Sequence, residues 1–524
     1  MKRKCLILFS CILFLISCKK QDVPDNPVTP PTHSKVPKLS TKPISDLTLY
    51  SVIVGGCIID TVGSNLTEQG VVVGTSSLPT LSNNLYKFSL KVDSLGNFGT
   101  TIINIPANTT YYLRAYGINA QGIGYGNEIS FTSLNEKVYN GDVTIYTQQE
   151  LNNFGANNYT TIKGSLYLWG GVTDLTPLNS LVIIGNGFEV RNTSLIDFTG
   201  LENLEIAGND LIHSVRIENN QSLKNFLGLK KLKITQGYFY VLNNDALVDL
   251  KGLDSYTTCA NGEFRIQDCD NLQSITGLEN MLYIYGSIYL INNLLLNDLT
   301  AWKNLEKISG RIYVVNNKSL TSINGFDNIN QIEDLDLLDN PILTDLKGLR
   351  NINSIEGINI RNNNLLSDLS SFNKITSVQY LTIESSNSVT DLKGFCNLQN
   401  IGVKLNIYRN PKLIDLTGLE KLNSLSHLYI HSNDSLLSLK GLNNLNKIIN
   451  NSYSITIGNN KNLKSLYGLN NLSQVNGYIQ IFNNALLTDF CPLKLLFTKG
   501  NNSDLNFSNN AINPSRDEII KNCQ

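Results

Sequence analysis

The most regular feature of the sequence is an apolar pattern that recurs about every 24 residues between residues 156 and 510. Ile312 and Val314 are spaced by two, as in a β-strand, and the apolar residues after them are mostly spaced by three before the strand pattern returns at Leu335. A polar residue or Gly follows each such strand two residues later. These turn positions are Gly170, Asn192, Asn219, Asn243, Asp268, Asn292, Asn316, Asp339, Asn362, Ser385, Arg409, Ser432, Asn459, Asn483 and Asn509.

A repeat of this length with one strand per repeat predicts a solenoid, because no single coil can bury its own apolar edge. We therefore expect a mainly β protein, in which a small β-sandwich is followed by an irregular leucine-rich-repeat or β-helix-like solenoid of about fifteen coils. Asn tolerates the left-handed backbone region and hydrogen-bonds nearby backbone in turns. The abundance of Asn is therefore expected to come from one turn used many times, with its side chain bonding the backbone of neighbouring coils.

Both ends of a solenoid need capping, since an open end exposes a sheet edge and apolar core. Thr147 and Glu150 have the spacing of a capping box, so residues 136–155 are predicted to form an amino-terminal cap with a short helix. Residues 511–524 are predicted to form a carboxy-terminal cap with a helical tail from Pro514 to Cys523.

The cysteines beyond residue 18 show no CxxC motif and no zinc-like spacing. Disulfides are permitted outside the cytoplasm. Plausible pairs are Cys259–Cys269 and Cys491–Cys523, and unpaired cysteines in apolar surroundings fit the sequence equally well.

Residues 45–135 show short alternating runs, such as Gly70–Val73 and Tyr111–Tyr116, separated by turn residues. Such a segment suits a β-sandwich. Pro106–Tyr111 resembles the Pro-x-x-Thr-x-Tyr entry into the sixth strand of fibronectin type III domains, and Gly126–Phe131 resembles their last strand. The resemblance implies a fibronectin type III-like domain that acts as a spacer or docking module.

The amino terminus has the features of a targeting signal. Lys2, Arg3 and Lys4 precede an apolar run, Leu6–Ile16, which is too short to span a bilayer and suits a signal peptide of residues 1–17. The following Ser17-Cys18 resembles the bacterial lipobox, which implies cleavage before Cys18, its lipidation, and attachment to a membrane. Lys19 favours the outer membrane, with display at the cell surface. Residues 18–44 are rich in proline and are predicted to form an extended spacer.

The repeated phrase of the solenoid resembles the receptor L domain family, the leucine-rich ligand-binding domains of insulin- and EGF-type receptors. Gly310–Asn317 and Leu405–Pro411 carry the matching phrase, and the resemblance spans about residues 140–510. It implies binding of a ligand through the solenoid surface.

In each strand, the residue between the two apolar positions is expected to point outward. The first half of this column is rich in Tyr and Arg, and Trp169 lies on the same face; these residue types dominate protein interfaces, and aromatic faces also stack on sugar rings. The alternative is that Tyr simply suits strands and pairs with its neighbours. The later half of the column, rich in Asn, Thr and Gln, resembles plain solvated sheet. The candidate ligand-binding residues are Tyr167, Trp169, Arg216, Tyr240, Arg265, Tyr289 and Tyr313.

Charge and motifs exclude several function classes. A formal net charge of -1 and a pI of about 6.5 give no positive field for nucleic acid. The sequence lacks GxSxG, HExxH and phosphate-loop motifs, and His427 and His431 lie too far apart along a strand to share a metal. We expect no enzyme, no cofactor and no metal. The leading hypothesis is a lipoprotein for protein binding or adhesion; a glycan-capturing lipoprotein and a structural envelope component without a discrete ligand are the alternatives.

Overall fold

The computed structural model describes residues 36–208, 215–449, 453–501 and 503–523. The chain divides into two compact units, with the boundary after Glu136. The predicted signal peptide and Cys18 lie outside the described residues. Each unit is described by itself.

The first unit consists of two antiparallel sheets that share one core. Val52 and Phe98 from one sheet pack with Val71 and Leu113 from the other, and all four side chains are buried. The first sheet has the order β1-β2-β5, and the second has the order β4-β3-β6-β7 with β8 also paired to β6. The strands are β1 (Lys38–Thr41), β2 (Ser51–Asp60), β3 (Glu68–Gly74), β4 (Tyr86–Ser89), β5 (Asn97–Ile103), β6 (Thr110–Asn119), β7 (Gly122–Tyr125) and β8 (Ile129–Thr132).

This unit begins earlier than predicted. The predicted extended spacer includes Lys38–Thr41, but this segment forms β1 and pairs antiparallel with β2. Leu39 has the only large apolar side chain of this short strand, and it is buried in the core of the unit. A single apolar residue in a proline-rich context gives too little periodicity to reveal a strand.

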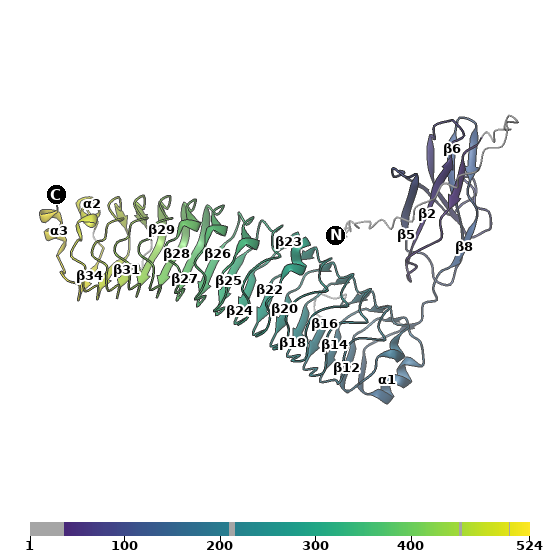
Figure 1. The fold of residues 1–524 in the computed structure, drawn as a ribbon, viewed down its shortest axis with the longest axis horizontal. Helices are drawn as coiled ribbons and strands as arrows, with labels where there is room; N and C mark the ends of the chain where they lie inside the picture. Colours follow the sequence, from purple (N-terminus) through teal and green to yellow (C-terminus); the bar gives the residue numbers. More distant parts are fainter. Residues whose placement is uncertain (1–35, 209–214, 450–452, 502, 524) are drawn as a thin grey trace, which may run out of the picture. The chain divides into compact units, whose positions relative to one another are not determined.

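The second unit is a parallel β-solenoid of about fifteen turns, as predicted (Figure 1). Most coils contribute one strand to the front sheet, and two of the later coils each contribute an additional two-residue strand. Ile312 lies opposite Leu335 in successive strands. The front sheet comprises β10 (Val143–Thr147), β12 (Leu166–Gly171), β14 (Phe188–Arg191), β16 (Val215–Glu218), β18 (Phe239–Leu242), β20 (Phe264–Gln267), β22 (Ile288–Ile291), β24 (Ile312–Val315), β25 (Asp334–Leu338), β26 (Gly357–Arg361), β27 (Ser377–Glu384), β28 (Asn400–Tyr408), β29 (Ser424–His431), β30 (Lys447–Ile448), β31 (Tyr453–Gly458), β32 (Gln474–Val475), β33 (Tyr478–Phe482) and β34 (Leu505–Ser508).

A second parallel sheet of two-residue strands runs along another side of the earlier coils. Short 3-10 helices connect the strands of several coils. The back-sheet strands are β9 (Val138–Tyr139), β11 (Thr161–Ile162), β13 (Ile183–Ile184), β15 (Ile206–Ala207), β17 (Ile234–Thr235), β19 (Thr258–Cys259), β21 (Tyr283–Ile284) and β23 (Lys307–Ile308); the 3-10 helices are η1 (Thr176–Leu178), η2 (Thr300–Asn304), η3 (Lys347–Leu349), η4 (Ser370–Phe372), η5 (Lys393–Phe395) and η6 (Cys491–Leu493).

One continuous apolar core fills the solenoid. Its aromatic members stack from coil to coil: the rings of Phe239 and Phe264 lie 5.2 Å apart and nearly parallel, and Trp302 packs against Phe326. Because burial of each coil depends on its neighbours, the core stabilises the stack rather than any single coil.

All fifteen predicted turn residues have a positive φ, close to the left-handed helical region. The prediction for these turns is confirmed. Most of the positions carry Asn, Asp or Gly, which tolerate this conformation best.

The turn residues bond neighbouring coils through their side chains: Asn316 Nδ2 donates to Asn292 Oδ1 at 2.8 Å, and similar pairs recur along the stack. The predicted side-chain bonds to the backbone of neighbouring coils come instead from the residue after the turn, which corrects the predicted partner of the turn Asn. Asn317 is fully buried, and its Oδ1 accepts from the backbone N–H of Asn293 at 3.2 Å. Its Nδ2 donates to the carbonyl groups of Leu290 and Val315, at 2.9 and 3.1 Å. The same arrangement recurs along the stack as a buried asparagine ladder, formed by Asn220, Asn244, Asn293, Asn317, Asn340, Asn363, Asn410, Asn433, Asn460 and Asn484.

The amino-terminal cap contains the predicted helix, α1 (Gln148–Gly155). Thr147 caps it and Glu150 completes the capping box. Leu151 is buried against the end of the core. The same predicted cap segment also holds β9 and β10, the first strands of the two sheets.

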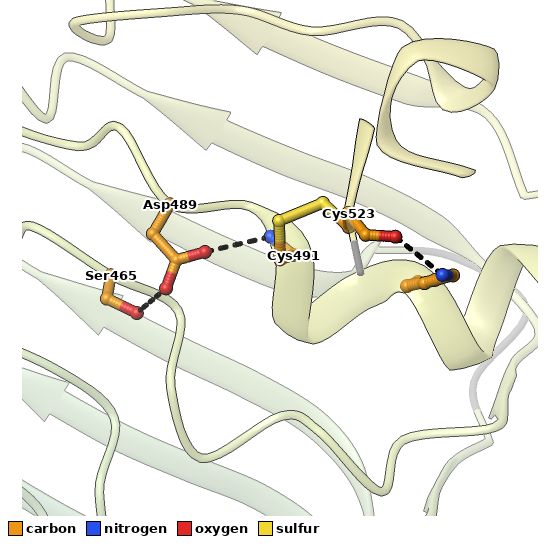
Figure 2. Close-up of a disulfide and its surroundings, with 5 residues drawn as sticks. Ser465, Asp489, Cys491 and Cys523 are labelled. Carbon is orange, nitrogen blue, oxygen red and sulfur yellow. Dashed lines mark hydrogen bonds between the residues drawn. A yellow bond between two sulfur atoms is a disulfide. The ribbon is translucent and has the colours of Figure 1, made fainter. Parts of the chain in front are cut away.

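At the other end, α2 (Lys494–Thr498) and α3 (Arg516–Asn522) close the stack. The predicted disulfide Cys491–Cys523 is present and ties the tail to η6 (Figure 2). Lys494 donates a hydrogen bond to the carbonyl group of Cys523, so both the disulfide and this hydrogen bond fix the carboxy-terminal tail.

The other suggested disulfide, Cys259–Cys269, is wrong. Cys259 lies in the back-sheet strand β19, whereas Cys269 follows the front-sheet strand β20, and neither is disulfide-bonded. Cys269 occupies a position of the asparagine ladder, and the N–H of Cys269 donates to Asn293 Oδ1. Burial raises the pKa of the Cys259 thiol to about 11 and that of Cys269 to about 12, so both thiols are protonated at neutral pH.

Candidate binding face

Alternate residues of the front strands point away from the core. In β18, Phe239 and Val241 are buried, whereas Tyr240 is partly exposed. This alternation brings the outward residues of successive coils into columns. All seven predicted ligand-binding residues lie in these columns and are partly exposed.

Five of the seven form one continuous row across five strands. Arg216, Tyr240, Arg265, Tyr289 and Tyr313 lie opposite one another in successive register pairs. The Arg265 guanidinium lies 4.1 Å from the centre of the Tyr289 ring and 5.8 Å from that of Tyr240. The rings of Tyr289 and Tyr313 are 5.5 Å apart. We call this row the aromatic–arginine patch.

Acidic residues hold the arginines in place. Arg216 makes a two-point ion pair with Glu218, at 2.8 and 3.2 Å. Arg265 pairs with Glu263 at 3.2 Å. The hydrogen bond from Arg216 holds the pKa of Glu218 below its usual value, so this carboxylate stays charged at neutral pH.

The hydroxyl group of Tyr240 completes the network. It donates to Glu263 at 3.1 Å, while the Tyr238 ring stacks on the Tyr240 ring at 5.2 Å. Burial and the Glu263 charge raise the pKa of Tyr240, so its hydroxyl remains a donor at physiological pH. Sequence reasoning missed Glu218, Glu263 and Tyr238, because it considered mainly the middle column of the face.

The other two predicted residues form a group of their own. Tyr167 and Trp169 contact each other, and Trp169 also contacts Tyr146 on β10; both ring pairs are 5.6 Å apart. The strand β14 lies between this group and Arg216. Arg191 on β14 pairs with Glu218 at 2.9 Å, so the charged network reaches toward the Trp169 group.

Beyond Tyr313 the face becomes acidic. Arg311 pairs with the buried Asp334 at 3.2 Å, and the Tyr380 hydroxyl donates to the same carboxylate from two coils away. Tyr380 reaches this far because a Cβ at Gly357 would lie 2.1 Å from its ring, so only Gly leaves the necessary space. Burial raises the pKa of the neighbouring Asp336.

A second aromatic group lies on the later coils, where a plain solvated sheet was predicted. Tyr408, Tyr429 and His431 have ring centres 5.4 to 6.1 Å apart, and Phe482 contacts His431 at 5.8 Å. We call these four residues and His427 the histidine–tyrosine cluster. Apart from Tyr429 and His427, its members lie in the outer column two residues beyond the middle one, and reading that column in the sequence would have found them.

Comparison with known proteins adds no family. No known protein-family model matches the chain, and no curated protein matches it. The described residues contain no helix that is both long and apolar enough to cross a bilayer. Within the same residues, no group of three or more His, Cys, Asp or Glu side chains is arranged to hold a metal ion. The fold therefore defines the class of the protein: a capped parallel β-solenoid joined to a small antiparallel β unit.

Proposed function

We propose that the protein is a lipid-anchored binding protein of the cell envelope, whose aromatic–arginine patch contacts a protein partner. The observation that carries the proposal is the placement of Arg265 between two tyrosine rings, with Glu263 fixing its guanidinium. Tyr and Arg are the residue types that contribute most to binding energy in protein interfaces.

Pre-organisation favours such a role. The side chains of Arg216 and Arg265 are 27% and 26% exposed, so they remain accessible although their acidic partners restrain them. A side chain already held in one conformation loses less entropy when a partner binds. The patch and the Trp169 group together span seven strands, a length of about 29 Å at the usual strand spacing. A surface of this length suits a folded protein.

Tethering is proposed from the amino-terminal sequence. The basic start, the apolar run Leu6–Ile16 and the Ser17-Cys18 junction support lipidation of Cys18 and attachment to the outer membrane, with display at the cell surface. The first unit would act as a spacer. Its strand order and the Pro106–Tyr111 segment support a fibronectin type III-like domain, and the repeated coil phrase supports kinship of the solenoid with receptor L domains.

Site-specific crosslinking tests the binding role. A photo-crosslinking amino acid at Tyr289 in cells is expected to capture one defined partner, and the same amino acid at Tyr283 on the back sheet is not. With the purified partner, Arg265→Ala and Tyr289→Ala should each raise Kd by about tenfold or more, as is usual for central interface residues. Tyr283→Ala serves as the matched control.

Two results would refute the proposed binding role. The first is equal crosslinking from both faces. The second is a partner whose affinity is unchanged by Arg265→Ala and Tyr289→Ala. If the natural protein instead bound neutral sugars and the Arg265→Ala and Tyr289→Ala variants did not, a glycan-capturing role would replace the protein-binding one.

Detergent phase separation tests the anchor independently. The natural protein is expected in the detergent-rich phase, and Cys18→Ala is expected in the aqueous phase. Equal membrane association of the two proteins would refute lipidation at Cys18 while leaving the binding role open.

A further inference from the structure

Three consecutive coils depart from the turn chemistry used elsewhere in the solenoid. Twelve of the fifteen turn residues are Asn, Asp or Gly, and the exceptions are Ser385, Arg409 and Ser432. Arg409 has φ +56°, a conformation that costs a long side chain with a Cβ more than it costs Asn or Gly. Backbone strain of this kind persists where another role compensates for it.

The departures coincide with the histidine–tyrosine cluster. Tyr408 immediately precedes Arg409, and His431 immediately precedes Ser432. The Arg409 guanidinium lies 4.6 Å from the centre of the Tyr408 ring. Two of the three coils that lack the usual turn residue therefore supply Tyr408, His427, Tyr429 and His431, four of the five members of the cluster.

Gly458 allows the cluster to extend across an intervening strand. His431, Gly458 and Phe482 are register partners on successive strands. A Cβ at Gly458 would lie 2.6 Å from the Phe482 ring and 3.0 Å from the His431 ring. The two rings therefore close over the glycine and make one apolar surface with Tyr429.

Hydrogen bonds and burial keep His431 neutral. Asn459 Nδ2 donates to its Nε2 at 2.6 Å, so Nδ1 carries the proton and donates to Ser432 Oγ at 2.7 Å. Burial, followed by the nearby Arg409 charge, lowers the pKa of His431. The histidine thus serves as an aromatic surface and carries no charge at neutral pH.

The cations at this cluster lack the acidic partners found at the first patch. Lys404 lies 5.3 Å from the centre of the Tyr429 ring, and among the described residues neither Lys404 nor Arg409 forms an ion pair. One carboxylate, that of Glu384, lies on the neighbouring strand as the register partner of Tyr408. By contrast, Arg216 and Arg265 are both ion-paired. Two cations without ion pairs beside partly exposed rings complement a ligand that carries both negative charge and apolar faces.

Two polar atoms in or beside the cluster also lack hydrogen-bond partners. They are Asn406 Oδ1 and His427 Nε2, both covered by neighbouring atoms within the described structure. Asn406 is the register partner of Tyr429, and His427 is that of Lys404. Covered polar atoms without partners are costly, and hydroxyl groups of a bound ligand are a chemistry that would satisfy them.

We propose that the histidine–tyrosine cluster is a second binding site, which takes an acidic oligosaccharide. The C–H faces of the sugar rings would pack on the electron-rich faces of Tyr408 and Tyr429, and Lys404 and Arg409 would hold carboxylate or sulfate groups. Lys404 lies over the Tyr429 ring and Arg409 over the Tyr408 ring, and the centres of these two rings are 6.1 Å apart. Because each cation lies over a different ring, the ligand that matches both is a chain with acidic groups on more than one sugar ring.

Titration of the purified protein with alginate oligomers, which carry a carboxylate on every ring, tests the site. Saturable binding is expected, with no binding of neutral dextran oligomers. Arg409→Asn should weaken binding at least tenfold and leave the melting temperature equal or higher, because Asn suits the left-handed turn. Tyr429→Ala should also weaken binding at least tenfold. Lys412→Gln removes an equal charge from a nearby exposed position and should change affinity less than twofold.

Several results would overturn the proposal. They are the absence of saturable alginate binding, full affinity in Arg409→Asn, or poly-glutamate binding as tightly as alginate, which would indicate an acidic peptide ligand. Arg265→Ala in the first patch should leave alginate binding intact. Failure of the proposed protein-binding patch and failure of this site are therefore distinguishable.

Discussion

Removal of one ladder asparagine should loosen the solenoid locally and by a predictable amount. In Asn317→Ala the buried Asn293 N–H loses its acceptor, and the Leu290 and Val315 carbonyl groups each lose a donor. A buried donor without a partner costs about 1–3 kcal/mol, and each ordinary hydrogen bond contributes about 1 kcal/mol or less. We expect local opening to become easier by about 2–4 kcal/mol.

Native-state hydrogen exchange measures this quantity coil by coil, which suits a repeat array whose unfolding is not expected to be two-state. Exchange of amides in the coils of Asn293 and Asn317 should accelerate on the order of 30- to 1000-fold. Lys318→Ala changes an exposed neighbour and should alter exchange by about twofold at most. Acceleration of less than threefold in Asn317→Ala would refute the ladder's role in stability.

The chain also offers the reverse experiment. Cys269 Sγ lies 3.9 Å from the Val241 carbonyl oxygen and 3.5 Å from that of Gln267, the two acceptors a ladder amide would use. Cys269→Asn should therefore restore the missing rung and slow local exchange by about fivefold, equivalent to about 1 kcal/mol. Faster exchange in this variant would show that the site cannot hold the amide.

Three further predictions concern cysteines and histidines. Iodoacetamide should modify only Cys396 among the described cysteines of the native protein, because the other reduced thiols are buried; mass spectrometry of the modified peptides checks this. Serine at both Cys491 and Cys523, which are 32 residues apart, should destabilise the carboxy-terminal cap by about 3–4 kcal/mol and expose its tail to limited proteolysis. Burial lowers the pKa of His427 and His431 in the folded protein, so the unfolded chain takes up protons at a higher pH than the folded protein does. The free energy of unfolding should therefore fall as the pH drops below about 6.5. Replacing both histidines by Gln should make the free energy of unfolding, measured by denaturant titration, depend less on pH.

The solenoid could be predicted because its signal is repeated. The spacing of Ile312, Val314 and Leu335 gives a strand and its successor, and the turn residues that follow have the expected left-handed conformation in every coil. The buried asparagine ladder was harder to predict from the sequence. Two adjacent polar residues such as Asn316 and Asn317 look alike in sequence, and only the packed coil shows that the second is buried.

Contacts between distant coils limited prediction of the candidate sites. The row from Arg216 to Tyr313 followed from the two-residue period of strands, whereas the Glu263 partner required reading a second column. The meeting of His431 with Phe482 depends on a glycine in the coil between them, and the sequence pattern treats that glycine as an ordinary strand position. The Cys259–Cys269 suggestion failed for a related reason, because closeness in sequence did not place the two residues on the same side of the coil.

Because of the asparagine ladder, the solenoid can be shortened or lengthened by one whole coil at a time. Because each rung bonds mainly to its immediate neighbours, excision of residues 340–362 would join Asp339 to Asn363 and recreate an intact turn and rung. Such a deletion would bring the two patches closer by about 4.8 Å, and a duplication would separate them by the same step. Evolution can thus tune the distance between two docking points in whole coils without redesigning either one.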